Sequence, residues 1–190
     1  MMPQNGINGA TYLALFLSQF DFQGNAKKYL DLIAETLHKD FFGEKVGLAY
    51  TDPKMGELTM NAGVFHFNKE SADNTIALNF RYPQGVDVDG IKAGLEKLEG
   101  PKAVSLSEHG HVPHYVPVND PMVETLLSVY EKQTGLKGHE QIIGGGTFGR
   151  LLKRGVAYGA MFPGYVNTMH QANEFTEVED LYRAAAIYAE

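Results

Sequence analysis

The chain has 190 residues, of which 44% are hydrophobic and 21% are charged, and it carries a formal net charge of −7 with no cysteine. This length and composition indicate a globular protein with one large domain or two small ones. Because phosphate groups are bound by clustered positive charge, the acidic balance argues against nucleic acid and anionic membranes as partners. No apolar run reaches the roughly 18 residues of a membrane span. Without cysteine, any metal must be held by His, Asp or Glu, and a cytoplasmic location is expected.

The first part of the chain predicts an α+β unit, in which helices cover one face of an antiparallel sheet. Helices are predicted where apolar residues recur at three- and four-residue spacing, and strands where apolar and polar residues alternate. The predicted helices cover residues 8–20, 25–38 and 88–98, and the predicted strands cover residues 46–50, 58–67, 75–82 and 103–106.

The same patterns predict which side chains point inward. On the strand 58–67, simple alternation places Val64 on the same face as Met60 and puts Phe65 on the opposite face. Asn25 is expected to cap the second helix. The apolar residues that recur along the first helix, and that we expect on its inner face, are Leu13, Phe16, Leu17 and Phe20.

The second part of the chain predicts the edge of a parallel α/β sheet. A proline-rich crossing separates two expected domains, which cover residues 1–112 and 113–190. Asp120 followed by Pro121 starts a helix, and Gly135 ends it. The remaining predicted elements are strands at 141–143 and 156–162, a short helix at 148–153, and a closing helix from Glu174 that Asn173 caps.

A glycine-rich loop, Gly-Gly-Gly-Thr at residues 144–147, lies between a predicted strand and a predicted helix. Such a loop lets backbone N–H groups approach a carboxylate or a phosphate. It can equally serve as a tight turn with close packing, and the pattern leaves both interpretations open. The loop has neither the spacing of a Walker loop nor that of a dinucleotide-binding fingerprint, which argues against nucleotide binding.

Other candidate residues lie at the ends of predicted elements. Arg81 lies at the end of a strand, where its planar guanidinium suits a substrate carboxylate or a surface ion pair. His170 lies in the loop before the last helix, at the edge where ligand sites of α/β sheets are found. Three further histidines have the spacing of a metal cluster, but Pro113 interrupts their geometry and a solvated linker is the simpler interpretation. They are His109, His111 and His114.

Six segments occur in a recognisable order along the chain: GINGATYLALFL, NFRYP, DPMVETLLSVYEKQTG, IIGGGTFGR, FPG and MHQANE. Together they resemble the dipeptidase V group of the aminoacylase and carboxypeptidase-like family of di-zinc metallopeptidases, over essentially the whole chain. The resemblance implies an α/β catalytic domain with two zinc ions and an inserted, ferredoxin-like α+β lid. Residues 1–112 would be the later part of the lid, and residues 113–190 the C-terminal part of the catalytic domain.

The resemblance also implies roles for individual residues. His170 corresponds to the C-terminal zinc-ligand histidine of the family. Gly145 corresponds to the loop whose backbone helps to hold the substrate's C-terminal carboxylate, and Arg81 to the lid arginine that binds the same carboxylate. The implied reaction is zinc-dependent hydrolysis of a dipeptide, in which two zinc ions activate a water and a glutamate takes its proton.

The remaining functional residues of that family have no counterpart in this sequence. They are a His-x-Asp pair, an acidic pair that includes the general base, a further acidic ligand and a lid histidine. We therefore expect a fragment that contains no catalytic residue, is inactive alone and has the N-terminal portion of the same protein as a partner. The alternative is a non-catalytic module that binds a carboxylate-bearing ligand or a partner chain.

Overall fold

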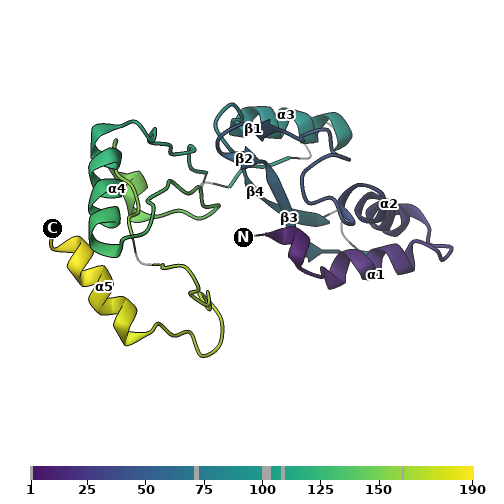
Figure 1. Cartoon of the computed structure of the whole chain (residues 1–190). Helices are drawn as coiled ribbons and strands as arrows, with labels where there is room; N and C mark the ends of the chain where they lie inside the picture. The colour runs from purple at the N-terminus through teal and green to yellow at the C-terminus, as the bar shows by residue number, and fades with distance from the viewer. Residues whose placement is uncertain (1, 71–72, 100–103, 108–109, 160) are drawn as a thin grey trace. The chain divides into compact units, whose positions relative to one another are not determined.

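The computed structural model describes the chain except for residues 1, 71–72, 100–103, 108–109 and 160. The chain divides into two compact units, Met1–Pro113 and His114–Glu190. Figure 1 shows the helices and strands of each unit. Among the described residues, no helix combines the length and the apolar character that crossing a membrane requires.

The first unit combines helices with two small antiparallel sheets, which confirms the α+β character predicted for it. The structure also confirms the three predicted helices and the two predicted strands at 58–67 and 75–82, with small shifts at their ends. Its helices are the 3₁₀ helix η1 (Pro3–Asn5), α1 (Gly9–Leu17), α2 (Gly24–Leu32), the π-helical turn η2 (Ile33–Leu37) and α3 (Val88–Glu99). Its strands are β1 (Thr51–Asp52) paired with β2 (Gly56–Glu57), and β3 (Thr59–His66) paired with β4 (Thr75–Arg81).

Two strands predicted in this unit are wrong. Residues 46–50 form the end of a turn and an irregular stretch, because Val46 packs into the core at 5% exposure instead of pairing with a neighbouring strand. Residues 104–106 have no regular structure, and residue 103 lies outside the described residues. The larger described sheet therefore has two strands, β3 and β4, which is fewer than a ferredoxin-like domain contains.

Helix α1 begins at a capping residue that also ties it to the sheet. The Oδ1 atom of Asn8 accepts a hydrogen bond from the N–H of Thr11 at 3.3 Å, and its Nδ2 donates to the carbonyl of Ala62 at 2.7 Å. The cap predicted for the second helix is wrong. Gly24, with a left-handed φ of 62°, turns the chain into α2, so Asn25 lies within the first turn.

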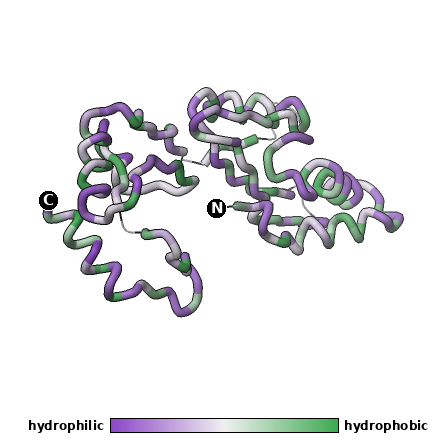
Figure 2. Tube along the Cα trace, viewed as in Figure 1, coloured by the Kyte–Doolittle hydropathy of each residue, from purple (hydrophilic) through white to green (hydrophobic). Residues whose placement is uncertain are grey.

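The inner face of α1 also differs from the prediction. The buried residues are the small Thr11 and Ala14, each 3% exposed, which allow the helix to lie close to η2. Leu13 and Phe16 are instead 57% and 56% exposed. Figure 2 shows the apolar character of this helix as a tube that is largely white to green. Because α1 is apolar on nearly all sides, its spacing could not identify the face that is buried.

A β-bulge at Gly63 changes which side chains of β3 face inward. Ala62 pairs with Leu78 and Val64 pairs with Ala77, so Gly63 is one extra residue on β3. A bulge of this kind breaks the simple alternation of a strand. Val64 is therefore 65% exposed, while Phe65 packs on the core, which reverses the prediction for these two residues.

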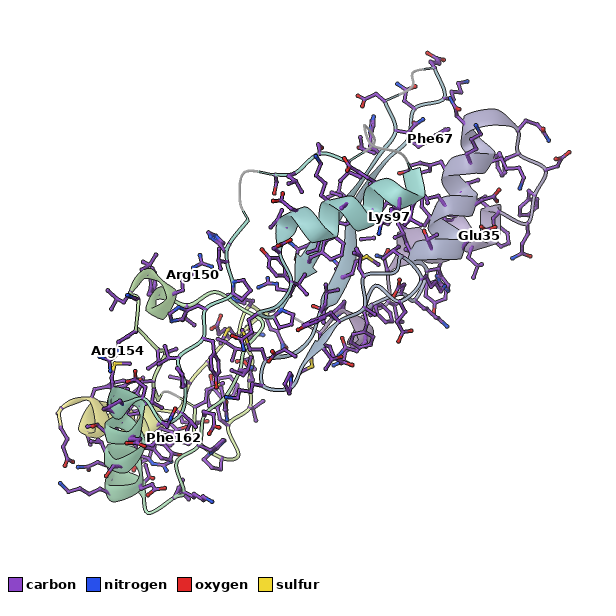
Figure 3. All side chains as sticks on the ribbon, turned by 90° about the horizontal axis from the view of Figure 1, so that it is seen from above. Glu35, Phe67, Lys97, Arg150, Arg154 and Phe162 are labelled. Carbon is purple, nitrogen blue, oxygen red and sulfur yellow. The ribbon has the colours of Figure 1, made fainter. Side chains whose placement is uncertain are left out.

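The core of the first unit lies on one face of the β3–β4 sheet. Met60 and Ala62 of β3, at 1% and 7% exposure, form a cluster with Ile33 and Leu37 of η2. Leu95 of α3 packs against the same cluster, and Figure 3 shows α3 lying across the strands. Helices therefore cover one face of the sheet, as predicted, and the other face carries the polar residues of both strands.

We expect Met60→Ala to lower the free energy of unfolding by about 2–5 kcal/mol, because it leaves a cavity among buried side chains. Chemical denaturation of the 190-residue chain would measure this change. Val64→Ala is the matched control on the same strand, with an expected effect of less than about 0.5 kcal/mol because the side chain is exposed. Equal losses for the two variants would contradict the bulge at Gly63.

The second unit is built on two helices that contact each other, α4 (Pro121–Thr134) and α5 (Val178–Tyr188). Asp120 caps α4 and Gly135 ends it with a left-handed φ of 68°, so both predictions for this helix are confirmed. Between the helices lies Phe162, which is 5% exposed. Its ring stacks on Tyr130 with centroids 6.4 Å apart and contacts the Arg183 guanidinium at 3.9 Å.

Several predictions for the second unit are wrong. Residues 141–143 and the described residues of 156–162 form no strand, since a strand is defined by pairing and no partner strand lies in the described part of this unit. The short helix is a 3₁₀ turn, η3 (Phe148–Leu151). Helix α5 begins at Val178, so Asn173 does not cap it. The parallel sheet edge is therefore not formed by the described residues.

An ion pair links the start of α4 to the segment after η3. The Nε and Nη2 atoms of Arg154 donate to the two carboxylate oxygens of Asp120 at 3.0 and 2.6 Å. This guanidinium, assisted by the capped N–H of Met122, lowers the pKa of Asp120 below its ordinary value of 3.8, against the opposing effect of desolvation. The carboxylate form is thus favoured in the folded state.

Arg154→Gln should therefore lower the melting temperature by a few degrees at pH 6, and this difference should shrink as the pH falls. Because the folded-state pKa of Asp120 is lowered, its contribution to stability is complete above pH 3.8 and is lost as the pH falls through the folded-state value. Thermal melts of both proteins between pH 6 and pH 2.5 would measure the trend. A difference that does not change with pH would contradict this linkage.

Candidate functional site

Arg81 lies at the end of β4, on the face of the sheet opposite the core. It pairs across the sheet with Thr59, and the next pair on that face joins Asn79 to Asn61. Pro83 ends the strand two residues later, because proline has no N–H to continue the ladder. Arg81 is partly exposed, so the described surface around it is polar and accessible on the side away from the core.

The sequence left two interpretations of the glycine-rich loop open, an accessible backbone and close packing, and the structure shows both. Gly145 is exposed, and a Cβ atom added to it would meet nothing within 4 Å, so its backbone is accessible. Close packing occurs a few residues later, where a Cβ on Gly149 would lie 2.8 Å from the carbonyl carbon of Val156. The loop thus exposes backbone at Gly145 while Gly149 holds the following turn tightly against the chain.

Arg150 is a candidate that the sequence interpretation did not identify. It lies in η3, and its guanidinium folds back over Gly146, where a Cβ would come within 2.7 Å of its Cζ atom. Figure 3 labels this side chain beside the turn of η3. The TFGR segment contained a signal for it, because an arginine follows the glycine-rich loop by only three residues.

His170 is exposed in the loop before α5 and has a left-handed φ of 63°. Such a conformation is uncommon for a residue other than glycine, and it persists where neighbouring contacts hold it. One such contact is the Oε2 atom of Glu174, which accepts a hydrogen bond from the His170 N–H at 3.2 Å. The His170 side chain is therefore exposed to solvent, and the hydrogen bond from its N–H helps to hold the backbone conformation.

The described residues do not form a metal site by themselves. Nowhere in the described ranges do three or more His, Asp or Glu side chains come together in a way that could hold an ion. An exposed imidazole at His170 suits zinc, but structural and catalytic zinc sites need at least three protein ligands. The residues present therefore fit one ligand of such a site and not the whole site.

Arg81 belongs to the first unit, whereas Gly145 and His170 belong to the second. Within the second unit, no hydrogen bond or ion pair among the described residues joins Gly145 to His170. A pocket of about 160 Å³ lies in the first unit between α1 and β3, and its lining includes Asn8 and Lys39 but not Arg81. Arg81, the predicted site residue of this unit, therefore does not line the pocket.

The histidines near the crossing have structural roles where they are described. The Nε2 atom of His114 lies 2.6 Å from the carbonyl oxygen of Gly155. The carbonyl of His111 accepts a hydrogen bond from the hydroxyl of Tyr82 at 2.9 Å. His109 lies outside the described residues. These contacts favour the simpler interpretation of the segment as a linker.

The family model described as "Peptidase family M20/M25/M40" matches residues 19–190. The chain therefore belongs to this peptidase family, and the resemblance recognised in its motifs is confirmed at that level.

Three relatives show the extent of the similarity. The "Beta-Ala-Xaa dipeptidase" of Lactobacillus delbrueckii subsp. lactis is 49% identical over 189 residues, which are 99% of this chain and 40% of that protein. "Putative dipeptidase YtjP" of Bacillus subtilis (strain 168) is 36% identical over 191 residues, and a "Putative dipeptidase" of Staphylococcus epidermidis is 37% identical over 196 residues. The chain spans 40% of the length of each of these relatives.

Proposed function

We propose that the protein to which this chain belongs hydrolyses dipeptides with the help of bound zinc, and that the chain supplies part of the substrate and metal site. The observation that supports this most directly is the 49% identity to a protein named as a dipeptidase, across 99% of the chain. We assign residues 1–112 to the lid and residues 113–190 to the catalytic domain. The protein is expected to be cytoplasmic.

In this proposal Arg81 and the loop at Gly145 hold the C-terminal carboxylate of the substrate. A guanidinium can donate two parallel hydrogen bonds to a carboxylate, which gives both affinity and a defined orientation. The accessible backbone at Gly145 lets an N–H group approach the same ligand without a side chain in the way. A carboxylate held in this manner fixes how much peptide can extend toward the reacting bond.

His170 would supply one zinc ligand, and the other ligands and the general base would come from residues beyond this chain. The family resemblance implies two zinc ions, whose chemistry is to lower the pKa of a bound water and to polarise the scissile carbonyl. Because the described residues form only part of such a site, the 190-residue chain is expected to be inactive alone. The chain's own contribution to the reaction is binding and orientation.

Arg81 and the loop at Gly145 form a carboxylate clamp that fixes substrate length. The full-length protein should therefore hydrolyse a dipeptide such as Ala-Ala with a kcat/KM at least about tenfold higher than for the tripeptide Ala-Ala-Ala. Chelation with EDTA should abolish activity, and added zinc should restore it. Product release measured for both peptides, before and after chelation, tests the proposal. Absence of hydrolysis of any dipeptide by the zinc-loaded protein would overturn it, and equal rates for both peptides would contradict the clamp.

A further inference from the structure

The segment from Gly146 to Arg150 brings a cationic side chain onto a glycine-rich loop. The guanidinium of Arg150 lies against Gly146, and its Nη1 atom is too close to the position of an added Cβ for both to fit. Gly146 does not have a left-handed φ, so its backbone conformation is open to other residues. A side chain at this position would instead compete with the guanidinium for the same space and would displace it.

The charges in this unit single out Arg150. Arg154 pairs with Asp120 and Arg183 pairs with Asp180. Arg150 forms no ion pair with any described residue, although the chain carries a net charge of −7 and many carboxylates. It is also exposed. An arginine that folds onto a loop instead of toward a carboxylate is placed to receive an anion from outside the unit.

The loop also has exposed backbone next to the glycine that Arg150 covers. Gly145 is exposed with open space on its Cβ side, so its backbone is accessible next to the residue that Arg150 covers. A guanidinium beside unhindered backbone N–H groups is complementary to a carboxylate, which can accept several hydrogen bonds at once. A neutral or cationic ligand would gain little binding energy from the same donors.

We propose that Arg150, whose guanidinium lies over Gly146, is a second cationic contact for the substrate carboxylate and determines specificity for peptides with a free C-terminus. This inference rests on the proposed function only for the identity of the ligand as a peptide. Gly146 is a positioning residue, because an alanine there displaces the guanidinium of Arg150.

Binding can be measured directly by NMR of the ¹⁵N-labelled arginine side chains in the full-length protein after EDTA has removed its zinc, so that Ala-Ala can bind without being hydrolysed. Titration with Ala-Ala should shift the Nε–H resonance of Arg150 in a saturable manner, and the C-terminal amide of Ala-Ala should not. Gly146→Ala should abolish the shift while the protein stays folded by circular dichroism. The proposal is overturned if Arg150 does not respond to Ala-Ala, or if it responds equally to the amide.

Kinetics separate this inference from the proposed function. Arg150→Gln should raise KM for Ala-Ala about 10- to 100-fold, the range for loss of a hydrogen bond to a charged group, with little change in kcat. Gly146→Ala should give a similar rise, and the double variant should add little to it. Lys153→Gln, an exposed cation three residues away, is the matched control and should leave KM unchanged.

The possible outcomes can be told apart. If dipeptides are hydrolysed but Arg150→Gln behaves like Lys153→Gln, the inference about Arg150 is wrong and the proposed function stands. If Arg150 responds to Ala-Ala in the NMR titration but no dipeptide is hydrolysed, the carboxylate contact stands and the proposed function is wrong.

Discussion

Replacing Arg81 with alanine is expected to lower kcat/KM for dipeptides about 100-fold in the full-length protein, because a charge-assisted, two-point contact to the carboxylate is lost. Arg81→Lys should restore only part of this loss, since an ammonium keeps the charge but not the planar pair of donors. Initial rates over a range of Ala-Ala concentrations would give the three values of kcat/KM.

The control for Arg81 is a substrate that lacks the carboxylate. With the C-terminal amide of Ala-Ala, the Arg81→Ala variant and the unchanged protein should differ little, because the contact is missing in both. If the variant loses as much activity toward the amide as toward Ala-Ala, Arg81 supports the structure of the lid and does not bind the carboxylate. Thr75→Ala, on the same strand and face, should leave both activities unchanged.

His170→Ala is expected to remove bound zinc and to lower kcat for dipeptides at least about 1000-fold, because a metal site that loses one of its few ligands loses affinity and geometry together. Metal content after dialysis, measured by mass spectrometry, would show the loss independently of activity. The expected content is at least one zinc fewer per protein than in the unchanged enzyme.

His139→Ala is the matched control for His170, because it removes an exposed histidine from the same unit. Its zinc content and kcat should equal those of the unchanged protein. A His170→Ala variant that keeps its zinc but loses activity would place His170 in contact with substrate instead of metal. A variant that keeps both its zinc and its activity would show that His170 is not part of the site.

Local patterns in the sequence predicted the elements whose signals are local. Helix α4 was predicted at both ends because Asp120 and Gly135 are cap residues with a direct chemical reason. The β3–β4 pair was predicted because alternation and a polar turn lie within one stretch of chain. The prediction of a strand at 156–162 was wrong because a strand needs a partner, and the local sequence does not show whether a partner is present.

The candidate site depended much more on resemblance than on pattern. Taken alone, His170 and Arg81 are an exposed loop histidine and an arginine at a strand end, and each has an ordinary structural explanation. Arg150 was missed although it follows the glycine-rich loop by three residues, because this spacing alone does not show that its side chain folds back over Gly146. That contact depends on backbone direction in an irregular loop, which apolar periodicity does not encode.

The bulge in β3 also bears on how this strand tolerates changes in chain length. Gly63 is the one residue of β3 without a counterpart on β4. Deleting it would leave Ala62 and Phe65 two positions apart, so both would still face the core in regular alternation. An insertion or deletion of one residue between Met60 and Ala62 would instead turn Met60 outward. Alignment gaps in this strand should therefore be placed at Gly63.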